Sequence, residues 1–122
     1  MALIDTAMSM TLRLKKVELD LRRALGPELD AAHITFEHWQ VIAALLEEPG
    51  LRMTELATAA VLPAATLTRH VDRLVEQALV IRRIDADDKR RAVVALSAQG
   101  EQLALRLHEL ELQVELAGRV MS

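Results

Sequence analysis

The chain has 122 residues, enough for one domain, and is 52% hydrophobic with only 2% aromatic residues. It contains no cysteine, which excludes disulfides and zinc sites built on thiolates. No apolar run approaches the roughly 20 residues of a membrane span, and the N-terminus lacks the pattern of a signal peptide, so we expect a cytoplasmic protein with no membrane contact.

Two helices are predicted in the first 50 residues. Over residues 8–25, leucine and valine recur at spacings of three or four, and Gly26-Pro27 is expected to end this helix. The second helix is predicted over 35–48, with Thr35 as its N-cap and Pro49-Gly50 after its end.

Two shorter helices follow, over residues 53–60 and 63–77. Pro63 is expected at the first helical position of the second one, because proline lacks the N–H that has no acceptor there. One face of this helix is apolar, and the opposite face carries threonine and charged side chains.

The last third of the sequence predicts a hairpin and one more helix. Strands are expected over 80–84 and 92–96, joined by a charged tip over 85–91. Ser97 is the expected cap of the final helix, where leucines from Leu103 onward repeat at spacings of four and three. We expect these leucines to be buried in a homodimer, with the first helix as partner.

Positive charge gathers at the hairpin, although the net charge of the chain is −3. Residues 52–93 carry eight cations against six anions, and five of these cations lie within ten residues: Arg82, Arg83, Lys89, Arg90 and Arg91. A basic hairpin behind a short exposed helix is typical of a winged helix-turn-helix and favours double-stranded DNA as the partner. The predicted fold class is therefore mainly α with a small β-hairpin (α+β).

The stretch from about Leu25 to Gly100 resembles the MarR family of winged-helix regulators. The matching segments are ITFEHWQVIAAL at 34–45, LRMTELA at 51–57, TLTRHVDRLVEQALVIRR at 66–83 and DKRRAVVALSAQG at 88–100. The last segment fits the wing signature of that family through Asp88, Arg90, Leu96, Ser97 and Gly100. Pro63, Ala65 and Ala78 depart from the residues that the family usually has at these positions. Ala78 is strained if its position needs a positive φ.

The resemblance implies a homodimeric regulator of transcription, most simply a repressor, that binds a pseudo-palindromic operator and releases it when a small molecule binds. Helix 63–77 would lie in the major groove and the 85–91 tip in the minor groove. Asp88 would orient the wing arginine. The residues expected to contact DNA are Thr54, Ala65, Thr66, Thr68, Arg69, Arg73, Lys89, Arg90 and Arg91.

The expected organisation is a single domain, 1–122, with a winged helix-turn-helix over 35–96 and dimerisation helices over 1–34 and 97–122. His38 and Trp39 are candidates for a ligand crevice, although a single tryptophan on an apolar helix face is more often core. No cofactor or metal site is expected, and no enzyme-like constellation stands out. The alternative is a winged-helix module that binds another protein and no DNA.

Overall fold

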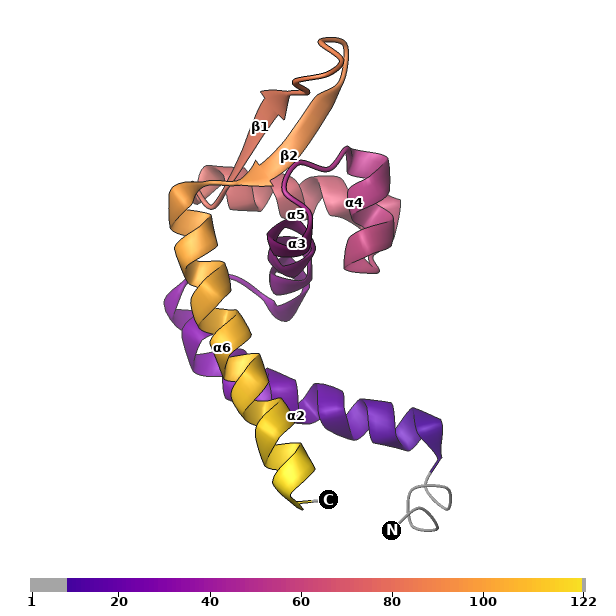
Figure 1. Ribbon diagram of the computed structural model, residues 1–122, viewed down its shortest axis with the longest axis vertical. Coiled ribbons are helices and arrows are strands. Elements are labelled where there is room, and N and C mark those ends of the chain that lie inside the picture. The colour runs from indigo at the N-terminus through magenta and orange to yellow at the C-terminus, as the bar shows by residue number, and fades with distance from the viewer. Residues whose placement is uncertain (1–8, 122) are drawn as a thin grey trace.

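The computed structural model describes residues 9–121, with side chains described through Gly118. The described residues form five helices and two strands. They are α2 (Met10–Ala31), α3 (Phe36–Glu47), α4 (Met53–Ala60), α5 (Ala64–Glu76), β1 (Val80–Ile84), β2 (Ala92–Leu96) and α6 (Ala98–Met121). In Figure 1, α3, α4, α5 and the hairpin form one lobe, and α2 and α6 cross beneath it. The predicted fold class, a mainly helical winged helix-turn-helix, is confirmed.

The first helix does not end at Gly26-Pro27 as predicted from the sequence. Helix α2 runs through both residues to Ala31. Gly26 has no Cβ to collide with the proline ring, and Leu25 and Leu29 on either side are both buried, so core packing maintains the helix. The helix ends where His33 takes a φ of 59° and the Ile34 N–H donates to the Leu29 carbonyl at 3.0 Å.

The other helix boundaries follow the sequence closely. Thr35 caps α3, and α4 has the predicted bounds. Pro63 is the N-cap of α5 rather than its first helical residue, since its ψ of 137° is extended, and Gln77 is the C-cap. Ala78 has a φ of 60°, so the strain expected for alanine at this position is present.

The hairpin forms the two predicted strands in antiparallel register, with Arg82 opposite Val94 and Ile84 opposite Ala92. Leu51, between α3 and α4, pairs with the other edge of β2 through two hydrogen bonds to Val94, of 3.0 and 2.8 Å. The base of the wing is therefore anchored to the helical lobe.

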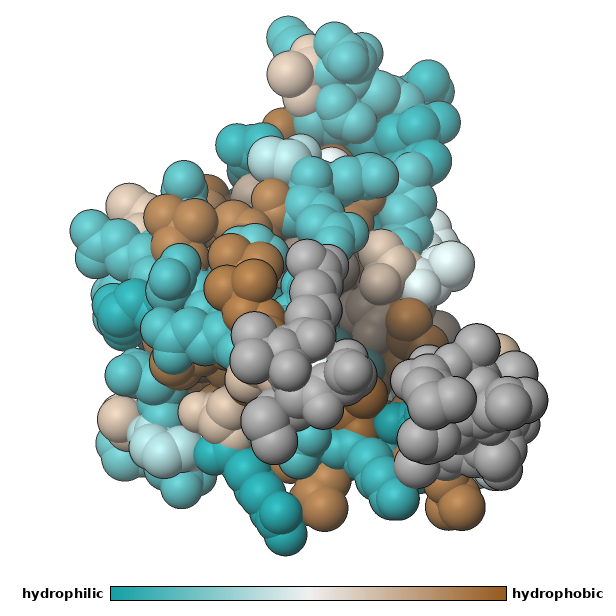
Figure 2. Space-filling model, turned by 60° about the horizontal axis from the view of Figure 1, so that its bottom comes forward, coloured by the Kyte–Doolittle hydropathy of each residue, from teal (hydrophilic) through white to brown (hydrophobic). Residues whose placement is uncertain are grey.

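The core lies between α3, α4, α5, the strands and the near ends of α2 and α6. Leu103 and Leu107 are buried within this chain, so the expectation that they are covered by a dimer partner is wrong. Other large apolar side chains of the two long helices are exposed: Met10, Leu12, Leu14, Val17 and Leu19 on α2, and Leu105, Leu112 and Leu116 on α6. Figure 2 looks toward this end of the molecule and shows apolar side chains exposed among polar ones. Among the described helices, none is long and apolar enough to cross a membrane.

Candidate nucleic-acid interface

Helix α5 presents one polar face to solvent because its other face is fixed in the core. Leu67, Val71 and Leu74, spaced at three and four residues, are almost completely buried. The remaining positions carry the predicted contact residues. Ala65, Thr68, Arg69 and Arg73 are exposed on α5, Thr66 is half-buried, and Thr54 is exposed in the first turn of α4.

The polar side chains of this face differ in whether they already have a hydrogen-bond or ion-pair partner within the chain. The Thr66 hydroxyl donates to the Pro63 carbonyl at 3.1 Å, which satisfies a hydroxyl that sequence reasoning had assigned to DNA. Arg73 lies 3.8 Å from a Glu76 carboxylate oxygen, in an exposed pair that contributes little stability. Thr68 and Arg69 make no side-chain hydrogen bond or ion pair with any described residue, so both can engage a ligand without losing an internal contact.

The carboxylate of Asp88 contacts two arginines at the wing tip. Asp88 Oδ1 accepts a hydrogen bond from the Arg90 backbone N–H at 3.0 Å and lies 3.5 Å from Arg90 Nε. Asp88 Oδ2 lies 3.1 Å from Arg91 Nε. The side chain of Arg90 is nevertheless 92% exposed, and Lys89 beside it is exposed as well. Asp88 thus restrains the two arginines while leaving the Arg90 guanidinium available to phosphates or a groove.

One cation of the hairpin has a partner that sequence reasoning missed. Arg82 Nη2 donates to Asp72 Oδ1 of α5 at 2.5 Å, across the junction between the wing and the exposed helix. The alternation of side chains along the strand could have predicted that Arg82 shares a face of the hairpin with the buried Val80 and Val94. It could not have shown that Asp72 stands opposite, because this depends on how the hairpin lies against α5.

A second missed group lies at the start of α4. Glu55 Oε1 accepts from the Arg52 backbone N–H at 3.0 Å, and its carboxylate also pairs with the Arg52 guanidinium. Hydrogen bonding to Arg52 lowers the pKa of Glu55, and the same contact raises the pKa of Arg52. A glutamate three residues after the residue that precedes an apolar helix is the sequence pattern that could have indicated this cap.

The proposed crevice residues lie largely in the core. Trp39 is 2% exposed, and its Nε1–H donates to Glu111 Oε2 at 3.2 Å. Glu111 also lines a hollow of about 570 Å³ between α2 and α6, together with Val17, Leu21 and Val114. His38 is 9% exposed and faces α5 through His70. Within the part of the chain that the structure describes, no three histidine, aspartate or glutamate side chains are placed to hold a metal ion.

A helix-turn-helix with an anchored, arginine-tipped wing defines this molecule as a winged-helix protein. Comparison with known proteins agrees: residues 34–91 match the model of the MarR family. Over 70 residues the chain is 39% identical to the transcriptional regulator HosA of Escherichia coli O157:H7, which covers 57% of this chain and 52% of HosA. It is 35% identical over 77 residues to the HTH-type transcriptional regulator FarR of Neisseria gonorrhoeae, covering 63% of this chain and 53% of FarR.

A solved structure resembles almost the whole chain. NadR in complex with 4-hydroxyphenylacetate matches with a TM-score of 0.77 and 28% identity, over 94% of this chain and 82% of NadR. Residues 34–91 therefore resemble the MarR family, and the fold of the whole chain resembles that of NadR. Its matched stretch spans about half the length of the curated relatives.

Proposed function

We propose that this protein is a dimeric, DNA-binding regulator of transcription. One observation carries the proposal: the exposed Arg90, restrained by Asp88 on an anchored wing, belongs to the same lobe as the exposed polar face of α5. Thr68, Arg69 and Arg73 of α5 would enter the major groove. The 85–91 tip would follow the adjacent minor groove, where Arg90 is attracted by the negative potential of A·T-rich sequence.

The dimer would form through the outer parts of α2 and α6. Apolar side chains such as Leu14, Val17 and Leu116 are exposed there, and a second copy would remove them from water. In this arrangement residues 35–96 bind DNA, and the segments 1–34 and 97–122 hold two such regions at the spacing of operator half-sites. Residues 1–8 and Ser122 lie outside the described residues.

A small molecule bound in the hollow between α2 and α6 would control that spacing. Glu111 joins the wall of this hollow to Trp39 of α3, so a ligand there would act on the DNA-binding region and on the dimer helices together. The likeness to NadR, whose structure holds 4-hydroxyphenylacetate, supports a ligand-responsive repressor. No catalytic role is proposed, since the matched relatives are regulators, and DNA as the partner implies a cytoplasmic location.

Arg90→Ala tests the proposal. Duplexes selected from a random pool by the wild-type protein serve as the probe, and Arg23→Ala is the control because Arg23 is an exposed cation on α2, away from the wing. We expect Arg90→Ala to weaken binding by about 1–3 kcal/mol, while Arg23→Ala binds as the wild type does and both remain dimers. Wild-type affinity should fall steeply as salt increases. A flat salt response, or equal affinity of Arg90→Ala, would contradict the wing assignment and favour a protein partner.

A further inference from the structure

The turn between α2 and α3 together with the first residues of α3, residues 32–38, contacts the exposed helix α5 at two points. We call this segment the elbow. The side-chain amide of Gln77, at the end of α5, donates to the carbonyl oxygens of Ala32 and His33, each at 3.1 Å. Two turns earlier on α5, the ring of His70 packs edge-on against the ring of His38, with centroids 4.9 Å apart and an interplanar angle of 83°. The elbow therefore sets where α5 lies relative to α2.

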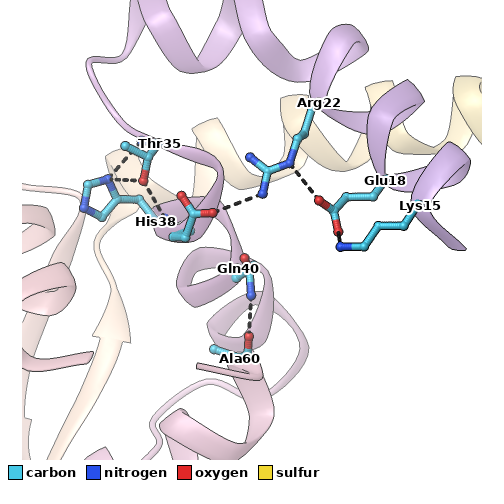
Figure 3. A network of polar contacts seen from close by, with 8 residues as sticks. Lys15, Glu18, Arg22, Thr35, His38, Gln40 and Ala60 are labelled. Carbon is cyan, nitrogen blue, oxygen red and sulfur yellow. Dashed lines mark hydrogen bonds and ion pairs between the residues drawn. The ribbon is translucent and has the colours of Figure 1, made fainter. Parts of the chain in front are cut away.

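The elbow itself is closed by the His38 ring. His38 is the third residue of α3, where a capping box ordinarily has glutamate or glutamine. The ring nitrogen Nδ1 of His38 accepts a hydrogen bond from the Thr35 backbone N–H at 2.9 Å (Figure 3). In return, the backbone N–H of His38 donates to Thr35 Oγ1 at 3.2 Å. A backbone N–H can only donate, so Nδ1 carries no proton in this arrangement and the ring is neutral.

The surroundings of the ring oppose a positive charge. Burial lowers the pKa of His38, and His70 and Arg73 of α5 lower it further, while Glu37 acts in the opposite direction. The charge of Glu37 is largely engaged by Arg22 of α2, whose Nη2 donates to it at 3.1 Å. A protonated ring would also lie at the positive N-terminal end of α3. Protonation would remove the acceptor of Thr35 and place like charges against α5.

We propose that His38 is a positioning residue for α5: its neutral ring holds the elbow against His70, and its protonation weakens DNA binding. The proposal rests on the DNA-binding function proposed above. Because the folded protein favours the neutral ring, the contact is complete above the ordinary histidine pKa of about 6.5 and is lost as the pH falls through the lowered pKa of the folded protein. DNA binding should therefore respond to mild acidification through a group that does not touch DNA.

The test compares wild type with His38→Gln and His33→Asn between pH 7.5 and 5.5, using the selected duplex. Glutamine keeps an acceptor for Thr35 but does not titrate, whereas His33→Asn removes an exposed imidazole from the same elbow and leaves the cap intact. Loss of one hydrogen bond corresponds to a loss of affinity of about threefold to tenfold. On going from pH 7.5 to 5.5, we expect wild type and His33→Asn to lose this much more DNA affinity than His38→Gln does. Circular dichroism confirms that each variant is folded at both pH values.

Imidazole and amide NMR of the full chain without DNA provides a second readout. We expect protonation of His38 on acidification to coincide with a loss of protection at the Thr35 amide, measured as its hydrogen-exchange rate relative to the intrinsic rate at each pH. Equal pH dependence of wild type and His38→Gln, or a Thr35 amide that is indifferent to the titration, would overturn the proposal. If none of the three proteins binds duplex DNA at pH 7.5, the proposed function fails, and the positioning role fails with it even if the NMR titration is as expected.

Discussion

Gly100 occupies a place where the structure allows no side chain. A Cβ built on it would lie 1.9 Å from the carbonyl oxygen of Leu79 and 2.9 Å from the carbonyl carbon, and both atoms belong to backbone that cannot rotate away. The same carbonyl oxygen accepts the Ser97 N–H at 3.0 Å, and the Ser97 hydroxyl donates to the Ala78 carbonyl at 2.6 Å. The first turn of α6 is thereby pressed onto the junction between α5 and β1.

Gly100→Ala should separate α6 from that junction. Relieving the overlap requires a shift of more than 1 Å, which breaks both Ser97 hydrogen bonds at a cost of about 1 kcal/mol each. Residual crowding in a packed region adds about 1–3 kcal/mol. The better helix propensity of alanine returns about 1 kcal/mol. We expect the free energy of unfolding to fall by about 2–4 kcal/mol, which corresponds to a Tm lower by roughly 8–16 °C for a chain of this size.

Urea unfolding followed by circular dichroism measures this change. Gly118→Ala is the matched control, since it lies in the same helix and a Cβ there would meet nothing within 4 Å. It should leave the urea midpoint unchanged or raise it slightly. A Gly100→Ala protein that unfolds at the wild-type urea concentration would show that α6 does not approach Leu79 in solution, and the reasoning would be refuted.

Two further predictions concern a strained turn and an ion pair. Val61 has a φ of 58° and is 81% exposed. Val61→Gly should relieve about 1–2 kcal/mol of backbone strain, while the greater entropy of the unfolded chain costs about 0.4–1 kcal/mol. The folded state should therefore be stabilised and the urea midpoint raised. An unchanged or lower midpoint would contradict this. Burial raises the pKa of Glu37, but the hydrogen bond from Arg22, a backbone hydrogen bond and the charges of Arg22 and His70 together outweigh it and leave the pKa lowered. Stability contributed by this carboxylate is therefore lost as pH falls through its folded pKa, and Arg22→Gln should move the Glu37 titration, followed by carboxyl NMR, to higher pH.

The helices and strands could be predicted because their signals are local. The bounds of α4 and both strands match the sequence-based ranges, since an apolar period and a turn-forming flank determine each of them. The end of α2 could not be predicted in this way. Gly26-Pro27 reads as a stop, but the helix continues because Leu29 is buried by residues distant in the sequence.

The candidate site was predictable to a similar extent. Asp88 and Arg90 are two residues apart, so their contact follows from the turn alone. The pairing of Arg82 with Asp72 depends on how the hairpin lies against α5, which no local pattern encodes. The family signature ending in Ser97 and Gly100 was read as a motif, and its physical reason is visible only in the structure: the serine caps α6, and only glycine fits against Leu79.

Backbone strain is concentrated at the turns on either side of α5 and at the elbow that contacts it. His33, Val61 and Ala78 all have φ near 60°, and each follows the end of a helix. In each case the N–H of the next residue donates to the carbonyl oxygen five residues earlier, at a distance of 3.0 Å, which satisfies a carbonyl at the helix end. A left-handed residue that is not glycine costs about 1–2 kcal/mol, so the three together consume a substantial part of an ordinary folding stability of 5–15 kcal/mol. Such strain persists only where surrounding contacts over-determine the backbone, and these turns set the position of α5 at both of its ends and along its side.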